Sequence, residues 1–198
     1  MCVFCGSSIG GRGAYADAAA SLGRELAARG IGLVYGGAGV GLMRVVAEAC
    51  RTAGGSVTGV IPESLVEAEV ADRDVDLRIV GSMHERKALM ADLAAGFVAL
   101  PGGFGTLEEF CEVLTWSQLG LHVPAKPCAL LDVDGFYAPL LELFDLGVGE
   151  GFIRPEHRRL VLAAPDPVGA LDALAAWEPP PPTRKWVDDG VAPDRDPT

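Results

Sequence analysis

Positive charge is scarce in this chain, which carries 16 Lys and Arg residues against 27 Asp and Glu residues. The formal net charge is −11 at pH 7. Proteins that bind the backbone of nucleic acids usually present a basic face that neutralises phosphates. The excess of acidic over basic residues therefore argues against a nucleic acid polymer as a partner. A small phosphorylated ligand is still compatible, because only a few local donors need to face it.

Long apolar runs are also missing. No stretch approaches the roughly 18 residues of a membrane span, and the first residues show no basic segment ahead of an apolar core. The five cysteines, an odd number, lie mostly inside apolar segments, as free thiols do in a reducing compartment. We expect a cytoplasmic protein with no membrane partner.

Metal-ligand spacings are incomplete. Cys2 and Cys5 form a C-x-x-C, but no second pair follows, and each of the three histidines lacks a partner at ligand spacing. We therefore interpret the cysteine pair as structural. We expect neither a metal site nor a bound cofactor.

The sequence also lacks two common nucleotide-binding motifs. No Gly-Lys dipeptide occurs, which excludes the P-loop, and the glycines of residues 36–41 miss the G-x-G-x-x-G spacing because Leu42 takes the last position. Residues 6–10 match the G-x-S-x-G nucleophile elbow, but nothing upstream of them could supply an oxyanion hole. We therefore interpret Ser7 and Ser8 as hydroxyl donors to a ligand.

Short apolar runs alternate regularly with longer amphipathic segments. The strand-like runs span residues 2–5, 31–35, 57–61, 77–80, 96–100, 127–131 and 159–163. The clearest helical patterns span residues 14–29, 42–52, 83–95 and 106–119. This alternation predicts an α/β fold, a three-layer open parallel sheet with helices on both faces. We expect one domain over residues 1–178 and a Pro-rich, charged tail over residues 179–198.

Glycines follow the buried run at residues 96–100 directly. The next segment reads Pro101-Gly102-Gly103-Phe104-Gly105-Thr106-Leu107-Glu108-Glu109. Its glycines allow a tight bend and a close approach to a ligand, while the first amides of the following helix carry partial positive charge. We predict that the turn with Gly102, Gly103 and Gly105 suits an anion, most often a phosphate.

Similar turns follow other predicted strands. They lie at residues 6–8, 36–41 and 81–82 and include the candidate ligand residues Ser7, Ser8, Gly36 and Gly37. The carboxyl ends of parallel strands meet at one edge of a sheet, where ligands of such folds bind. We therefore expect these turns to converge on the turn at residues 101–106.

Arg86 is out of place in its predicted helix, which Ser82 should cap. It shares a stripe with Leu89, Met90 and Leu93, so it should face inward, in a first turn whose dipole disfavours cations. An inward cation needs an anionic partner. That partner is either a structural carboxylate, a ligand phosphate or Glu109. Lys87, off this stripe, should be a solvated or supporting cation.

Thr106 and Glu109 also have the spacing of a helix capping box. In that interpretation both side chains satisfy backbone amides and have no chemical role. The three preceding glycines and the second acid at Glu108 are not needed for capping. Both interpretations stay open on the sequence.

Four motifs occur together in order. They are Cys5-Gly6-Ser7-Ser8, Tyr35-Gly36-Gly37 with Gly41-Leu42-Met43, Met83-His84-x-Arg86-Lys87, and Pro101-Gly102-Gly103-x-Gly105-Thr106-x-x-Glu109. Together they resemble the LOG (Lonely Guy) family, cytokinin riboside 5′-monophosphate phosphoribohydrolases often mislabelled as lysine decarboxylases. The resemblance spans roughly residues 2–177. It departs at Arg44, where the family usually has glycine.

The resemblance implies a Rossmann-like homodimer that hydrolyses the N-glycosidic bond of N6-modified adenosine 5′-monophosphates. The family's catalytic arginine and glutamate match Arg86 and Glu109, and its phosphate turn matches Gly102, Gly103, Gly105 and Thr106. Gly36, Gly37, Met83 and Lys87, within the same motifs, complete the expected substrate-binding set.

Two other functions were weighed against hydrolysis. A decarboxylase would need a Schiff-base lysine, and the chain offers only Lys87, Lys126 and Lys185, none in a convincing cofactor context. A non-catalytic carrier, such as the molybdenum-cofactor carriers of related fold, is the stronger alternative. It would need the anion-binding turn but not Arg86 and Glu109 together.

Overall fold

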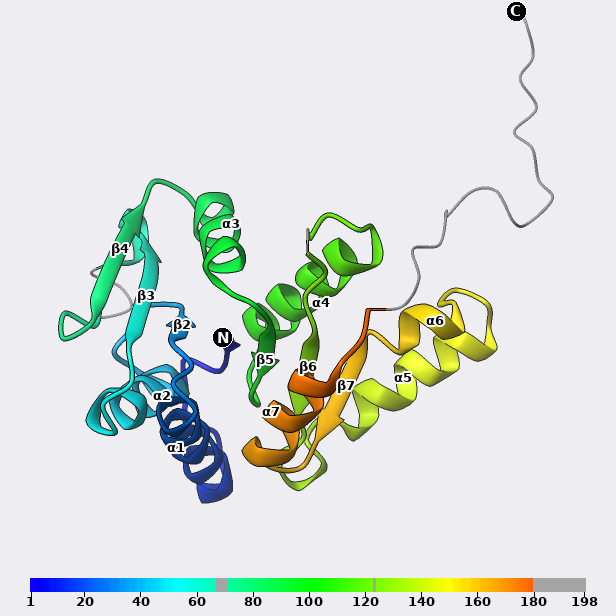
Figure 1. Cartoon of the computed structure of the whole chain (residues 1–198), viewed down its shortest axis with the longest axis horizontal. Helices are drawn as coiled ribbons and strands as arrows, with labels where there is room; N and C mark the ends of the chain where they lie inside the picture. The colour runs from blue at the N-terminus through cyan, green and yellow to red at the C-terminus, as the bar shows by residue number, and fades with distance from the viewer. Residues whose placement is uncertain (67–70, 123, 180–198) are drawn as a thin grey trace, which may run out of the picture.

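The computed structural model describes residues 1–66, 71–122 and 124–179 of the chain. Within them, seven parallel strands form one sheet in the order β4-β3-β2-β1-β5-β6-β7 (Figure 1). The strands are β1 (Cys2–Phe4), β2 (Leu33–Tyr35), β3 (Val57–Pro62), β4 (Asp76–Val80), β5 (Phe97–Ala99), β6 (Cys128–Leu131) and β7 (Val161–Ala164). Each lies in one of the predicted apolar runs or overlaps it, so the α/β prediction is confirmed.

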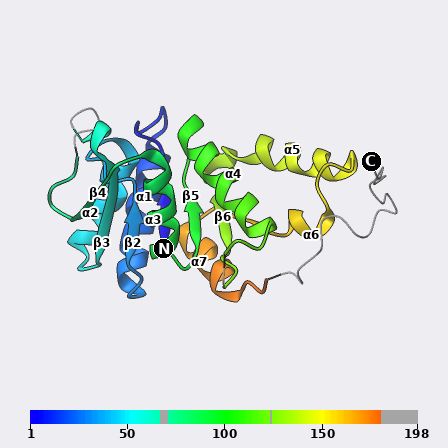
Figure 2. The same cartoon turned by 90° about the horizontal axis from the view of Figure 1, so that it is seen from above.

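Helices connect these strands. They are α1 (Gly13–Ala28), α2 (Gly41–Thr52), α3 (Met83–Leu93), α4 (Phe104–Gln118), α5 (Ala138–Gly149), α6 (Pro155–Arg158) and α7 (Pro167–Ala176), with 3₁₀ turns η1 (Glu63–Leu65) and η2 (Val133–Gly135). Both views place α5 and α6 at the end of the molecule opposite β4 (Figures 1 and 2). Most of the predicted tail, residues 180–198, lies outside the described residues.

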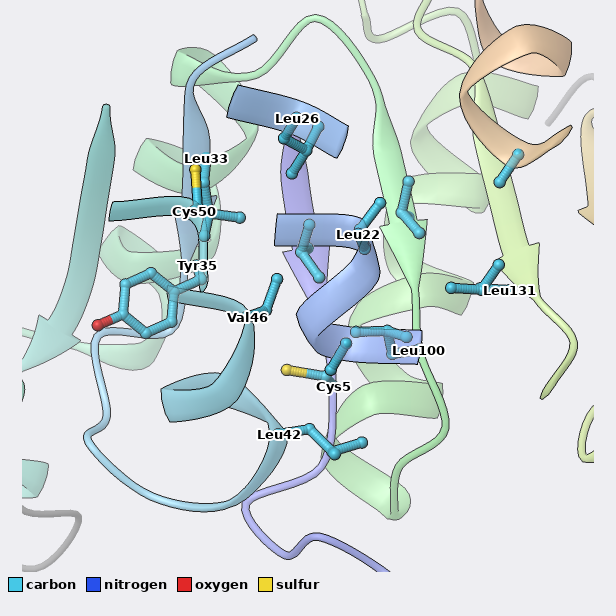
Figure 3. Packing of buried hydrophobic residues seen from close by; sticks show 14 of the residues in the cluster. Cys5, Leu22, Leu26, Leu33, Tyr35, Leu42, Val46, Cys50, Leu100 and Leu131 are labelled. Atoms are coloured by element: carbon cyan, nitrogen blue, oxygen red, sulfur yellow. The ribbon is translucent and has the colours of Figure 1, made fainter. Parts of the chain in front are cut away.

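Two hydrophobic clusters cover the two faces of the sheet. Helices α1, α2 and α7 contribute to one cluster, which Figure 3 shows around Cys5, with Leu22 of α1, Leu42 and Val46 of α2 and Leu100. Helices α3 and α4 contribute to the other. Strand β1 alternates between the clusters, as a strand covered on both sides must. The helices therefore form layers on both faces, as predicted.

The stripe predicted for α3 is only partly correct. Ser82 caps this helix, since its side chain accepts a hydrogen bond from the amide of Glu85 at 3.2 Å. Arg86 and Met90 are buried, but Leu93 is 49% exposed. The helix ends at Leu93, earlier than the predicted residue 95, because Ala94 adopts an extended conformation toward β5. Leu93, the last residue of the helix, is therefore not part of the buried stripe.

The strand order reverses beside β1. The chain runs outward from β1 through β2 and β3 to β4, and then places β5 on the other side of β1. The loop after β1 leads to α1 on one face, while the loop after β5 leads to α4 on the opposite face. Such a reversal opens a crevice at the carboxyl ends of the two strands. None of the helices in the described ranges is long and apolar enough to span a membrane.

Candidate active site

Three turns at the carboxyl edge are joined by backbone hydrogen bonds. The amide of Gly6 donates to the carbonyl of Pro101 at 3.1 Å, and the amide of Leu42 donates to the carbonyl of Gly6 at 3.0 Å. Gly41 has a φ of +57°, and a Cβ there would collide with the backbone of Ser7. The predicted convergence of these turns is therefore confirmed.

A pocket of about 310 Å³ opens between these turns and the start of helices α3 and α4. Among the predicted site residues, it is lined by Ser7, Gly36, Met83, Arg86, Gly103, Gly105, Thr106 and Glu109. The rest of its lining comes from residues 3–6 at the end of β1 and from Met43, Leu65, Met90, Phe104 and Glu108. The pocket thus combines charged and polar groups with apolar side chains.

Arg86 is buried with its guanidinium beside this pocket. Its Nη2 donates to the carbonyl of Gly36 at 3.3 Å, and its Nη1 contacts the sulfur of Met83 at 3.7 Å. Its Nε has no hydrogen-bond partner among the described residues. A guanidinium carries five N–H donors, so this one retains bonding capacity for an anionic ligand. The predicted inward orientation of Arg86 is confirmed.

Glu109 is the carboxylate nearest to that guanidinium. Its Oε1 lies 3.9 Å from Nη2 of Arg86, and only 13% of its side chain is exposed. Arg86 stands on α3 and Glu109 on α4, so the pair joins two helices at the pocket wall. The two opposite charges face the same small volume.

The capping-box interpretation of Thr106 and Glu109 is wrong. Helix α4 begins at Phe104 with Gly103 as its N-cap, and no side chain caps it. A capping box needs the threonine at the N-cap position itself. Thr106 instead lies in the first turn, with its hydroxyl so close to Gly102 that a Cβ on that glycine would collide with it.

The start of α4 can bind an anion. The first intrahelical bond is donated by Leu107 to the carbonyl of Gly103 at 3.1 Å. The amides of Phe104, Gly105 and Thr106 therefore precede the hydrogen-bonded turns, at the positive end of the helix dipole. All three residues line the pocket. This geometry suits a phosphate group.

Lys87 lines neither this pocket nor the adjoining one. Its Nζ donates to Glu108 at 2.8 Å and to Glu112 at 2.9 Å. Burial acts to lower the pKa of Lys87, but the hydrogen bonds to the two glutamates outweigh it, so the pKa is raised. In this arrangement Lys87 links α3 to α4. Its predicted contact with substrate stays a prediction.

A second pocket of about 260 Å³ adjoins the first. It shares Gly6, Ser7 and Gly103 with the first pocket, and it takes in the predicted residues Ser8 and Gly102. The crevice therefore has two compartments with a common wall at the glycine turn.

Gly37 lines neither compartment. It has a φ of +77° and packs against Ile61 and Leu77. Its carbonyl accepts a hydrogen bond from the amide of Asp72 at 2.9 Å, and the carboxylate of Asp72 accepts another from Tyr35 at 2.9 Å. Gly37 thus fixes the turn whose neighbouring carbonyl, at Gly36, holds Arg86.

The cysteine pair is not a redox centre. Cys2 and Cys5 are free and buried. Burial raises the pKa of both thiols well above the ordinary value, and the nearby carboxylate of Glu109 raises it further. Both are therefore protonated near neutral pH. The described residues contain no group of three or more His, Cys, Asp or Glu side chains that could hold a metal ion.

Comparisons with known proteins identify the family. A family model described as possible lysine decarboxylase matches residues 43–174. Rice "Probable cytokinin riboside 5′-monophosphate phosphoribohydrolase LOGL9" is 55% identical over 180 residues, 90% of this chain and 78% of that protein. The Arabidopsis thaliana enzyme named LOG7 is 49% identical over 180 residues, 90% of this chain and 82% of that protein. This chain belongs to the LOG family.

Solved structures share the fold of this LOG-family chain. The molybdenum cofactor carrier protein from Chlamydomonas reinhardtii has a TM-score of 0.64 at 24% identity, covering 88% of this chain and 94% of that chain. The molybdenum cofactor binding protein from Rippkaea orientalis has a TM-score of 0.66 at 21% identity, with the same coverage. Likeness at this level of identity concerns the fold alone.

Several pocket residues of this LOG-family chain were not predicted. Phe104 is 93% exposed at the rim, at the variable position of the glycine motif, and Leu65 enters from the 3₁₀ turn after β3. An aromatic residue between glycines was a usable signal for Phe104, whereas nothing local marks Leu65. Arg44, the departure from the family pattern, does not line this pocket and lies 3.6 Å from Glu48 on the surface of α2.

Proposed function

We propose that this protein hydrolyses the N-glycosidic bond of N6-modified adenosine 5′-monophosphates and releases the free base and ribose 5-phosphate. The observation that carries the proposal is the placement of Arg86 and Glu109 on one pocket with the uncapped start of α4. The names of relatives about half identical to the chain support the same reaction.

The start of α4 provides the site for the 5′-phosphate. The amides of Phe104, Gly105 and Thr106 and the hydroxyl of Thr106 supply donors, and Ser7 lies on the same pocket wall. Binding the phosphate there fixes the nucleotide at one end. The ribose then extends from α4 toward Arg86 and Glu109.

Glu109 acts on the sugar. As the bond between C1′ and the base nitrogen breaks, its electron pair leaves with the base and the ribose gains oxocarbenium character. A carboxylate close to C1′ stabilises that positive charge and orients the attacking water. The water oxygen bonds to C1′, one proton ends on the departing base, and ribose 5-phosphate remains.

Arg86 has a positioning and an electrostatic part in this scheme. Its guanidinium is fixed by the carbonyl of Gly36 and faces Glu109 at 3.9 Å. The positive charge lies on the same pocket wall as Glu109 and can bind the phosphorylated ribose.

Lysine decarboxylation does not fit this pocket. No lysine lines it among the described residues, and Lys126 donates to the carbonyl of Ala91 at 2.7 Å. Lys87 is bonded to two glutamates, and Lys185 lies outside the described residues. A Schiff base to a cofactor needs a lysine at the reacting centre.

The carrier alternative has one observation in its favour, the shared fold of the molybdenum-cofactor proteins. A carrier has no need of a carboxylate facing the ligand, because a negative charge repels a phosphorylated compound. Glu109 at the pocket wall therefore favours hydrolysis.

Base release tests the proposal directly. Purified protein is incubated with isopentenyladenosine monophosphate and separately with AMP, and free base and ribose 5-phosphate are quantified by chromatography. We expect the two products in equal amounts from at least one substrate. Tight nucleotide binding with no base released from any nucleoside monophosphate would favour the carrier.

We also propose that the protein is a homodimer. Helix α5 is rich in apolar side chains, yet none of its residues is buried in the single chain, and Leu143 and Leu146 are 59% and 58% exposed. A second copy covering them would remove apolar surface from water.

Light scattering should give a dimer for the wild type and a monomer for Leu143→Glu/Leu146→Glu. The control, Val168→Glu on α7, should stay dimeric. A monomeric wild type at micromolar concentration contradicts the proposal.

A cytoplasmic location is proposed as well. The five cysteines are free thiols, and four of them are buried, which suits a reducing compartment. A fluorescent fusion found in another compartment would contradict it.

Residues 1–178 are proposed to form one catalytic domain followed by a tail over residues 179–198. The continuous sheet from β4 to β7 supports a single folding unit. Limited proteolysis should remove the tail and leave a fragment close to residues 1–178, with unchanged thermal stability. Early cleavage within residues 1–178 would contradict this division.

A further inference from the structure

The second compartment of the crevice has no part in the reaction proposed above. We call it the second lobe; it is lined by Gly6, Ser7, Ser8, Ile9, Gly10, Tyr15, Leu42, Pro101, Gly102, Gly103 and Phe136. It measures about 260 Å³, against about 310 Å³ for the pocket that holds Arg86 and Glu109. The reaction proposed above places the base and sugar of a nucleoside monophosphate in the first of the two, near Glu109.

Aromatic and aliphatic side chains form the second lobe. The rings of Tyr15 and Phe136 meet edge to face, with centroids 5.7 Å apart. Gly10, at a φ of +72°, lies so close to the Tyr15 ring that a Cβ there would approach it to 2.7 Å. Ile9 and Phe136 are partly exposed, although both are large and apolar. These residues form a ring-lined wall that is accessible to a ligand.

The charge of the second lobe differs from that of the first pocket. None of its lining residues is acidic or basic, and its polar groups are the hydroxyls of Ser7, Ser8 and Tyr15 and the backbone. An isolated anion gains little from such walls. A planar ring gains more, because base rings stack on aromatic side chains and bury apolar surface.

The two compartments meet where the phosphate is expected. Gly6, Ser7 and Gly103 belong to both, and Gly103 is the N-cap residue of α4, whose start has no side-chain cap. The crevice lies at the reversal of strand order between β1 and β5. In open parallel sheets, this is the position where dinucleotides lie with one nucleoside on each side of their pyrophosphate.

We propose that the second lobe binds the second nucleoside of a dinucleotide whose pyrophosphate crosses the wall at Ser7 and Gly103. The ligand class is therefore a nucleoside 5′-phosphate that carries another ring-bearing group through a diphosphate link. This inference rests on the proposed function, since it takes the first 5′-phosphate to lie at the start of α4. Such ligands compete with nucleoside monophosphates for the first pocket.

Calorimetric titration with ADP and with diadenosine diphosphate tests the inference. Both ligands carry one adenosine and a diphosphate, and only the second adds another nucleoside. We expect diadenosine diphosphate to bind about tenfold more tightly, which is within the range of a base stacked on an aromatic ring. Tyr15→Leu and Phe136→Leu should each reduce this affinity ratio toward one. The matched control Phe152→Leu, at an exposed phenylalanine outside both compartments, should keep the wild-type ratio.

The outcomes separate this inference from the proposed function. The proposed second lobe is contradicted if the wild type binds diadenosine diphosphate and ADP with nearly equal affinity. It is also contradicted if the affinity ratio is unchanged in both Tyr15→Leu and Phe136→Leu. A ratio that both variants reduce, together with no base released from any monophosphate, supports the lobe and overturns the hydrolase. Failure of ADP and diadenosine diphosphate to bind the wild type overturns the second lobe, whereas the hydrolase is overturned only if no nucleoside monophosphate, isopentenyladenosine monophosphate included, releases its base.

Discussion

The guanidinium of Arg86 lies 3.9 Å from the carboxylate of Glu109, and their side chains are 7% and 13% exposed. The two groups come from different helices, and the guanidinium is also held by the carbonyl of Gly36. The distance is longer than a direct hydrogen bond, and both residues line the same pocket. The first two predictions below follow from this arrangement.

Glu109→Gln should abolish turnover while the fold and nucleotide binding are kept. The amide has nearly the shape of the acid but lacks the charge that stabilises an oxocarbenium ion, so we expect kcat to fall by at least about 100-fold. AMP affinity from calorimetry and the melting temperature should change little. The control is Glu142→Gln, the same change at an exposed position on α5. Near-normal rates in Glu109→Gln would leave this residue without a catalytic role.

Gly36→Ala should reduce activity through Arg86. A Cβ at this position would collide with Nη2 of Arg86 and lie 3.0 Å from the sulfur of Met43. The end of the arginine side chain can move more easily than the backbone, so we expect the guanidinium to be displaced. kcat/KM should fall at least about tenfold, which corresponds to about 1.4 kcal/mol. Gly11→Ala, where a Cβ meets nothing within 4 Å, should keep wild-type kinetics. Equal effects in both variants would contradict the assignment.

Lys87→Met should lower the free energy of unfolding by about 1–3 kcal/mol, because it leaves two glutamates without their shared partner. Oε2 of Glu112 is already buried without a hydrogen bond among the described residues. Replacing it as well, in Lys87→Met/Glu112→Leu, should recover much of the loss, since apolar residues can substitute for a buried ion pair. Urea unfolding measures both. Additive losses in the double variant would contradict the ion-pair interpretation.

The stability of the protein should fall as the pH drops from about 7 to about 5, in part through His122. This side chain packs against Phe97 and Trp116. Burial, and then the charge of Lys126, lower its pKa below the ordinary value. The unfolded chain therefore takes up a proton at a higher pH than the folded chain, and acid favours unfolding in that window.

Urea unfolding at pH 7.5 and pH 5.5 checks this prediction. His122→Phe, which keeps an aromatic ring between its neighbours, should flatten the pH dependence. The control is His84→Gln, a change at an exposed histidine. In this variant the free energy of unfolding should depend on pH as it does in the wild type. An unchanged slope in His122→Phe would show that other groups cause the effect.

Much of the fold was predictable because the central strands β1, β2, β5 and β6 are buried on both faces, although the edge strand β4 is largely exposed. Runs such as residues 96–100 have no polar alternation, so their strand character is visible locally. Helix α5 was not predicted, since its apolar residues surround the helix and do not form one stripe. The apolar residues of α5 indicate a helix surface that the rest of the single chain does not cover.

The site was predictable where a residue contradicted its surroundings. Arg86 was conspicuous as a cation on an apolar stripe in a first turn, and it is buried as expected. The role of Thr106 was ambiguous because the true N-cap residue, Gly103, has no side chain that would mark the start of α4 in the sequence. Leu65, Tyr15 and Phe136 could not be found locally, because only the packing of distant segments brings them to the crevice.

The hydrogen bonds from Gly6 to Pro101 and from Leu42 to Gly6 join segments that are synthesised at different times. The crevice is therefore complete only late in synthesis. A nascent chain that has emerged only as far as α3 contains Arg86 but lacks the strand and turn that complete the crevice. Nucleotide binding should therefore begin only after α4 has left the ribosome. In the finished protein, amide exchange at Gly6 and Leu42 should report opening of the central strands and not local motion of a loop.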